Sequence, residues 1–494
     1  MNLVTTAALA PFWLVMLWRN GRYGLLVLGI LAPLMNSAAF GQGGAITVPW
    51  VTSLLFSAMT LLSRRSHPHA RVLLRQREFQ LICLVPFVNL VVMLLSQILY
   101  AGKIRVLVGD AAFTIGRELV LSLFPQHINQ AIYSVAAPVL ICAVFCRLRM
   151  QDDEGKGEGA AALLRFYVAY TVSASLIILW ERVHQMTGVW YWSDMFHSTY
   201  SMTAWIQSIN GVSRLSGPYP EPSNLAYHLG PLAVMFAWLG YYKSYKYILF
   251  SLLLAVIMFM STSTTAFIGI GLVAATFGVL ILRWYGDGLS ARGDGSAERA
   301  AISIVAAMIL VVVMGFVVAQ YAGFVDQVLQ SVLNKQSSSS YQARSYADSL
   351  GVTAFVETNG LGVGLGGHLT NSGAILIMSN LGVAGICLVA ALIVSATRRV
   401  LKDGSISNYL LISGQNSELF CLRVPLAAML FTFMVTHILT APLFISPLLW
   451  VTVAVFLYVS CGIRALAPGQ RSLKLASIQP SPGLRPLLPE NRGR

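Results

Sequence analysis

The stretch Arg214-Leu215-Ser216-Gly217-Pro218-Tyr219-Pro220-Glu221-Pro222-Ser223-Asn224 leads directly into an apolar run. Its glycine and prolines forbid a regular helix before position 222, because proline removes an amide donor and favours extended geometry in the preceding residue. The last three residues predict a helix start, since proline suits a first turn and serine or asparagine caps one. Arg214 and Glu221 then lie where free amides and the helix dipole favour an anion. The stretch predicts either a phosphate site beside a membrane or an ordinary loop with an ion pair.

The composition places this stretch in a membrane protein. Hydrophobic residues make up 56% of the chain, charged residues 11%, and the mean hydropathy is +0.70. Soluble domains carry about 25% charged residues. We expect no cleavable signal peptide, because the N-terminus lacks a basic region. All six cysteines fall in or beside apolar runs, so no disulfide framework is expected.

Apolar runs predict an all-α, polytopic fold with about 11–13 transmembrane helices. The runs at 247–261 and 424–440 are short enough to be half-spans. The predicted spans lie near 3–18, 23–40, 46–62, 79–99, 128–146, 165–181, 223–241, 247–261, 264–282, 301–320, 373–397, 424–440 and 444–463.

The basic residues predict the topology, because Lys and Arg accumulate in cytoplasmic loops. If the three loops 100–127, 182–222 and 321–372 lie on one side of the membrane, most of the 33 basic residues fall on the other side. The net charge of +14 then reflects this bias and attraction to anionic lipid, and does not imply nucleic-acid binding.

Each outer loop has its own character. The apolar spacing of Phe113–Phe124 predicts a short interfacial helix. Loop 182–222 is rich in aromatic residues, which form interfacial belts or stack on sugar rings. Loop 321–372 is long and partly apolar, which predicts an ordered, functional segment. On the cytoplasmic side, the acidic residues of Gln151–Gly159 are expected in a solvated, flexible turn.

The order of several short motifs resembles the O-antigen polymerase and O-antigen ligase superfamily. The motifs are the block from Arg214 to Asn224, the hydroxyl-rich turn Ser261–Thr265, Arg344, and Gly360-Leu361-Gly362-Val363-Gly364-Leu365-Gly366. The resemblance covers roughly residues 205–390. It divides the chain into N-terminal membrane helices (1–204), a catalytic core (205–397), C-terminal membrane helices (398–464) and a disordered cytoplasmic tail (465–494).

The resemblance implies a bacterial inner-membrane glycosyltransferase with two large periplasmic loops that contain short helices. Its donor would be a glycan on undecaprenyl diphosphate, and it would need no metal or other cofactor. A flippase and a chain-length co-polymerase would be its partners. Arginines of the two loops would hold the diphosphate, a role that transfers to Arg214 and Arg344, with Arg117 a third candidate and Asn224 beside them.

The chain departs from the family at the position where the ligases have histidine, which here is Asn371. This departure favours a polysaccharide polymerase over a ligase and leaves the catalytic base open among Glu221, Asp348, Glu357 and His368. Asn371 can orient a hydroxyl but cannot take its proton. A transporter of lipid-linked sugars is the alternative from another class, but transporters place ionisable groups near the bilayer midplane. The predicted spans are nearly free of charge.

Overall fold

In the residues that it describes, the computed structural model is mainly helical, with two short hairpins. Five of the described helices, α5, α6, α7, α11 and α15, contain segments long and apolar enough to cross a membrane. Shorter apolar segments lie in α1, α3, α10, α16 and α17. The structure describes residues 3–18, 23–39, 47–108, 117–155, 157–197, 208–209, 212–261, 263–290, 339–402, 417–439 and 446–464.

The helices are α1 (Leu3–Trp18), α2 (Gly24–Leu31), α3 (Val48–Leu61), α4 (Ser66–Leu74), α5 (Arg77–Tyr100), α6 (Pro125–Glu154), α7 (Glu158–Thr187), α8 (Ser193–Phe196), α9 (Pro222–Tyr242), α10 (Lys246–Met260), α11 (Thr264–Ser290), α14 (Ser339–Glu357), α15 (Gly373–Lys402), α16 (Ser417–Leu439) and α17 (Pro447–Arg464). The strands are β1 (Arg105–Val108), β2 (Arg117–Val120), β3 (Ser208–Ile209) and β4 (Val212–Ser213).

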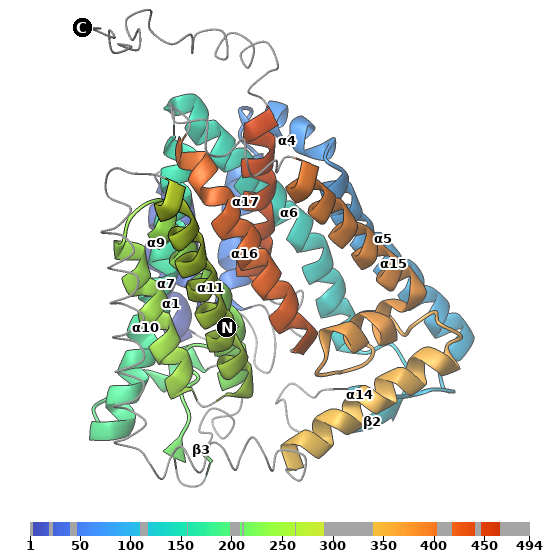
Figure 1. Cartoon of the computed structure of the whole chain (residues 1–494). Helices are drawn as coiled ribbons and strands as arrows, with labels where there is room; N and C mark the ends of the chain where they lie inside the picture. The colour runs from blue at the N-terminus through green and yellow to red at the C-terminus, as the bar shows by residue number, and fades with distance from the viewer. Residues whose placement is uncertain are drawn as a thin grey trace, which may run out of the picture.

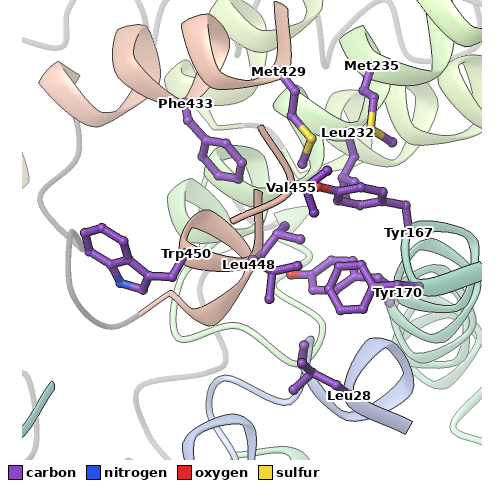
Figure 2. Packing of buried hydrophobic residues seen from close by; sticks show 14 of the residues in the cluster. Leu28, Tyr167, Tyr170, Leu232, Met235, Met429, Phe433, Leu448, Trp450 and Val455 are labelled. Atoms are coloured by element: carbon purple, nitrogen blue, oxygen red, sulfur yellow. The ribbon is translucent and has the colours of Figure 1, made fainter. Parts of the chain in front are cut away.

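Helix α9 occupies the interior of the bundle (Figure 1). Most of its side chains are buried, and it packs against α7, α10, α11 and α16. Figure 2 shows part of this core, where Met429 of α16 and Val455 of α17 approach Leu232 of α9 and Tyr167 of α7. Because its neighbours enclose α9, its first residues have a fixed position at one end of the bundle.

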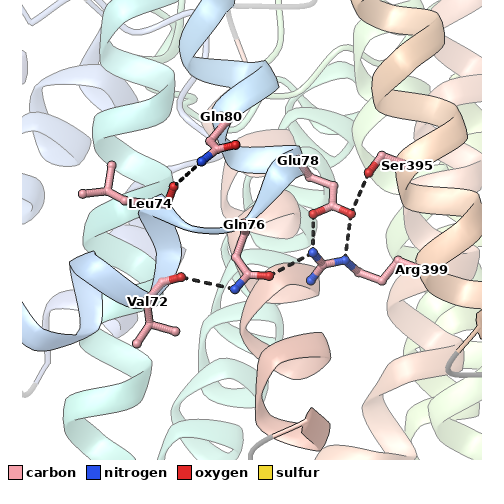
Figure 3. A network of polar contacts seen from close by, with 7 residues as sticks. All are labelled: Val72, Leu74, Gln76, Glu78, Gln80, Ser395 and Arg399. Atoms are coloured by element: carbon pink, nitrogen blue, oxygen red, sulfur yellow. Dashed lines mark hydrogen bonds and ion pairs between the residues drawn. The ribbon is translucent and has the colours of Figure 1, made fainter.

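At the opposite end of the bundle, charged side chains form hydrogen bonds between helices (Figure 3). Arg399 of α15 donates from Nε to Glu78 of α5 at 2.8 Å and from Nη2 to the second carboxylate oxygen. Ser395 also donates to this carboxylate, and Arg423 of α16 donates to the Arg399 carbonyl. Glu78 and Arg399 are only 4% and 5% exposed. Removing one member of such a pair costs about 3–5 kcal/mol, because a buried charge is left uncompensated.

The acidic residues of Gln151–Gly159 belong to this same end, and the expected flexible turn is wrong for most of that segment. Helix α6 continues to Glu154, and only then does the chain turn into α7. Asp152 accepts a hydrogen bond from Tyr458 of α17, and Asp153 lies 3.0 Å from His69 of α4. These partners extend the helix beyond the apolar run.

At the end of the bundle where α9 begins, the glycine-rich segment between α14 and α15 forms hydrogen bonds to neighbouring helices. Val363 and Gly364 donate their N–H groups to the carbonyls of Ser379 and Asn380 of α15, at 3.0 and 2.8 Å. The next residue, Leu365, donates to Asn89 of α5, at 2.7 Å. Helix α15 is broken at Gly382, whose φ is +63° and whose Cα faces this segment. The glycine-rich segment therefore replaces helix hydrogen bonds at a kink in α15.

The predicted interfacial helix at 113–124 is wrong for its described part. Arg117–Val120 form strand β2, which pairs antiparallel with β1, and residues 113–116 lie outside the described part. Ile104, Val106 and Leu121 of this hairpin pack with Ala354 of α14. The backbone N–H and C=O groups of this segment thus bond to a strand close in sequence. In an isolated helix they would have bonded within the helix itself.

Most predicted spans coincide with described helices, and the predicted helix start at Pro222 is confirmed. The span predicted at 23–40 is a shorter helix in the structure, because α2 ends at Leu31. The two residues that follow form a turn. Loop 321–372 contains the 19-residue helix α14. The predicted span 301–320 and the tail 465–494 lie outside the described residues.

Gly362→Ala is expected to destabilise the fold strongly. A Cβ at this position would lie 2.7 Å from the Gly382 nitrogen and 2.8 Å from the Asn380 oxygen, and the φ of +85° adds about 1–2 kcal/mol of strain. Gly102→Ala is the matched control, because its φ is +79° but nothing lies within 4 Å. Thermal melting in detergent measures both. Equal melting temperatures for the two variants would contradict the packing described.

Candidate functional site

Helix α7 shapes the turn that precedes α9. Glu181, which is fully buried, accepts the N–H of Gly217 at 2.5 Å. Gln185, one helical turn later, donates to the Arg214 carbonyl at 3.4 Å. Gly217 has a φ of +57°, and a Cβ there would lie 2.3 Å from Ile178 of α7. The Glu181 carboxylate of the apolar helix α7 therefore fixes the backbone of the turn that carries Arg214.

Three charged side chains meet where α9 begins. Arg344 of α14 lies with Nη2 3.5 Å from Oε2 of Glu221, the N-cap residue of α9. Ser223 donates to the same oxygen at 2.9 Å. Burial lowers the pKa of Arg214 to about 10, the charge of Glu221 opposes this shift, and the charge of Arg344 adds to it. Arg214 thus lies close enough to this ion pair for both charges to shift its pKa, and it stays protonated near neutral pH.

The charge and exposure of this cluster suit an anion. Two guanidinium groups and one carboxylate leave a net positive charge at a helix N-terminus, where the dipole also favours anions. The side chains of Arg344 and Glu221 are 39% and 38% exposed, so solvent and ligands can reach them. Glu221 makes no side-chain capping bond to the first-turn amides. Asn224 lies in this first turn, and its carbonyl accepts from His228.

Helix α14 connects this cluster to the start of α15. Asp348 lies four residues after Arg344, so both face the same side of the helix. Its Oδ1 accepts the N–H groups of Asn371 and Ser372, at 2.9 and 3.2 Å. Asn371 is therefore placed near the cluster through its backbone, while Asp348 is engaged in capping α15.

The environment of His368 differs from the one expected of a catalytic base. It is 2% exposed. Its Nδ1 accepts from the N–H of Leu107 at 3.0 Å, and its Nε2 donates to the Ala347 carbonyl at 2.9 Å. Burial lowers its pKa, so the ring is held neutral. This geometry favours a structural role that joins β1 to α14.

The remaining two candidates, Glu357 and Arg117, have no described contact with the cluster. Glu357 is exposed at the end of α14, 13 residues after Arg344, which is about 20 Å along the helix. Arg117 is exposed on β2. Among the described contacts, no hydrogen bond or ion pair joins Arg117 to Arg214, Glu221 or Arg344.

Aromatic side chains gather near the end of α7, the helix that also bonds to this turn. Trp180 donates its indole N–H to the Trp190 carbonyl at 2.8 Å, and their rings lie 5.5 Å apart. Tyr191 packs edge-on against Trp180 and is buried, whereas Trp190 is 65% exposed. Trp190 thus presents a flat apolar face to the surroundings.

The described residues contain no group of three or more metal-ligating side chains. Sequence reasoning did not single out Glu181, because it treated this residue as the end of an apolar span. The signal that could have found it was a lone carboxylate one helical turn before Gln185.

Comparison with protein-family models, curated proteins and solved structures found no match.

His368→Ala is expected to lower stability without removing activity from the folded protein. It leaves a buried N–H group and a buried carbonyl unpaired, at about 1–3 kcal/mol each. His67→Ala on the surface of α4 is the matched control. The melting temperature and the activity per folded molecule separate the two roles. Lost activity at an unchanged melting temperature would instead identify His368 as a catalytic residue.

Proposed function

We propose that this protein is a polysaccharide polymerase of the bacterial inner membrane with its site facing the periplasm. It transfers a growing glycan from undecaprenyl diphosphate to the terminal sugar of another lipid-linked repeat unit. The observation that carries the proposal is the meeting of Arg214, Arg344 and Glu221 at the start of α9. In this reading the fold has about 11–13 membrane spans, and α14 belongs to a periplasmic loop.

The cluster supports binding of a diphosphate for electrostatic reasons. Guanidinium groups bind phosphate oxygens with two parallel hydrogen bonds, and two such groups match the two phosphates. The ion pair of Arg344 with Glu221 is partly exposed, and such pairs contribute about 0–1 kcal/mol. A diphosphate, with its higher charge, can therefore replace the carboxylate as the partner of Arg344.

The neighbouring aromatic residues support a sugar substrate. The exposed Trp190 packs against Trp180 of α7, the helix whose Glu181 and Gln185 bond to the Arg214 turn. Aromatic faces stack on the apolar faces of sugar rings. The same site would serve a ligase that attaches finished glycans, and Asn371 in place of the ligases' histidine favours the polymerase.

Arg344→Lys and Arg214→Lys should each reduce polymer formation at least tenfold. A lysine keeps the charge but cannot form the paired hydrogen bonds of a guanidinium. Arg105→Lys is the matched control, because Arg105 also pairs with an exposed outer carboxylate, Glu118, at 3.0 Å. Polymer length and amount are measured on gels at equal membrane levels of protein. Full activity of both site variants would contradict the proposal.

Polymer formation in purified membranes is expected to survive EDTA. The arginines and the first-turn amides of α9 would neutralise the charge that develops on the leaving diphosphate. Loss of activity with EDTA, followed by recovery with magnesium or manganese, would show that a metal does this work instead.

A further inference from the structure

Arg147, near the end of α6, is a charged side chain in a buried position. The residue is 7% exposed, and among the described residues it forms no hydrogen bond and no ion pair. Its Nε is completely enclosed, whereas its two terminal nitrogens are not, so the tip of the guanidinium group still reaches the surface. Arg399, which is as strongly buried, has Glu78 as its counter-charge. Buried charges are normally paired in this way, because an isolated one is costly to remove from water.

The carboxylates at this end of α6 are already engaged elsewhere. Asp152 accepts a hydrogen bond from α17, and Asp153 pairs with α4. Glu154 lies two turns after Arg147 on the same face of the helix, but its ion pair is with Arg65, at 3.7 Å. The described part of the chain therefore supplies no counter-charge in contact with Arg147, and an anion from outside the protein can fill this place.

Helix α4 lies against the same part of α6. The Cys146 thiol donates to the carbonyl of Ser66, the first residue of α4, at 3.5 Å. The ion pair of Arg65 with Glu154 forms just before this helix begins. Helix α4 lies at the end of the bundle opposite α14 (Figure 1). The junction of α4 and α6 is therefore remote from the arginine cluster at the start of α9.

The surface of α4 and its flanking turns is strongly basic. It carries five exposed arginines, Arg64, Arg65, Arg71, Arg75 and Arg77. Among the described residues, only Arg65 of these five has an ion pair. Exposed apolar side chains lie between them: Leu62, Val72 and Leu74. Basic and apolar side chains side by side are typical of a surface that binds anionic lipid, because one kind attracts the headgroup and the other contacts the acyl chains.

We propose that the junction of α4 and α6 binds an anionic phospholipid, with Arg147 as the counter-charge of its phosphate. The guanidinium tip of Arg147 donates to the phosphate oxygens, and the unpaired arginines of α4 favour a lipid whose headgroup has a net negative charge. A choline headgroup would instead bring a positive charge to this surface. The inference does not rest on the proposed function, because it concerns the opposite end of the bundle.

Binding of phosphatidylglycerol to the purified full-length protein tests the proposal. Native mass spectrometry counts the bound lipids as phosphatidylglycerol, phosphatidylcholine or inorganic phosphate is added. The wild type should bind phosphatidylglycerol in preference to the other two. Arg147→Met should bind it at least about tenfold more weakly, because hydrogen bonds to a charged group are lost. Arg165→Met is the matched control and should bind as the wild type does, since Arg165 is exposed near the same end and pairs with Glu158 at 3.2 Å.

Melting temperatures in nanodiscs give an independent reading. Phosphatidylglycerol should raise the melting temperature of the wild type above its value in phosphatidylcholine, because a ligand of the native state stabilises it. Arg147→Met should lose this rise, yet melt no lower than the wild type in phosphatidylcholine, because an unpaired buried charge has been removed.

Three results would overturn the proposal. The first is equal binding of the two lipids by the wild type, and the second is unchanged binding of phosphatidylglycerol by folded Arg147→Met. The third is displacement of phosphatidylglycerol by inorganic phosphate, which would identify a site for a soluble anion. If Arg147→Met does not fold, the exposed double variant Arg71→Gln, Arg75→Gln decides, and an unchanged preference for phosphatidylglycerol would contradict the proposal.

Discussion

Close packing of the segment Gly360–Gly367 sets the geometry of the end of the bundle at which α9 begins. Its backbone bonds to α15 at the kink and to Asn89 of α5, and Gly366 lies against the backbone of Gln126 in α6. A side chain at Gly366 would lie 2.4 Å from the Gln126 oxygen. The segment also connects α14 to α15, so its position decides where α14 lies. Arg344 reaches the start of α9 because of this packing.

The ion pair of Arg344 with Glu221 could not position these helices by itself. A partly exposed pair contributes about 0–1 kcal/mol, whereas each buried, unpaired backbone group costs about 1–3 kcal/mol. The rigid contacts are those of the scaffold: Glu181 with the Gly217 turn, His368 with β1 and α14, and Asp348 with the start of α15. The weak pair at the surface is therefore free to exchange its carboxylate for a ligand, while the guanidinium groups stay in place.

Sequence patterns predicted the apolar helices well, because twenty-residue apolar runs and proline at a first helical turn are local signals. The β1–β2 hairpin could not be predicted in this way. Its apolar residues fit an amphipathic helix equally well, and the strand is favoured by the pairing with β1 and the contact with Ala354 of α14. The meeting of Arg214 and Arg344 was expected only from the resemblance, since the two residues lie 130 positions apart.

The roles of the histidines and of Glu181 could not be predicted either. His368 was a candidate base by sequence, yet the fold closes around it and uses both ring nitrogens. Glu181 lies at the end of an apolar run, where a single polar residue gives no local indication of its partners. Its environment arises from a segment distant in sequence, which the local pattern does not reveal.

The central claim is that the start of α9, with Arg214 and Arg344, holds a lipid diphosphate. Equilibrium binding of undecaprenyl diphosphate to the purified protein in nanodiscs tests it most directly, with undecaprenol as the uncharged comparison. The account predicts that the diphosphate binds much more tightly than the alcohol, and that a double Arg214→Gln, Arg344→Gln variant loses this preference while keeping its melting temperature. Equal binding of the two lipids by the wild type, or an unchanged preference in the folded double variant, would contradict it.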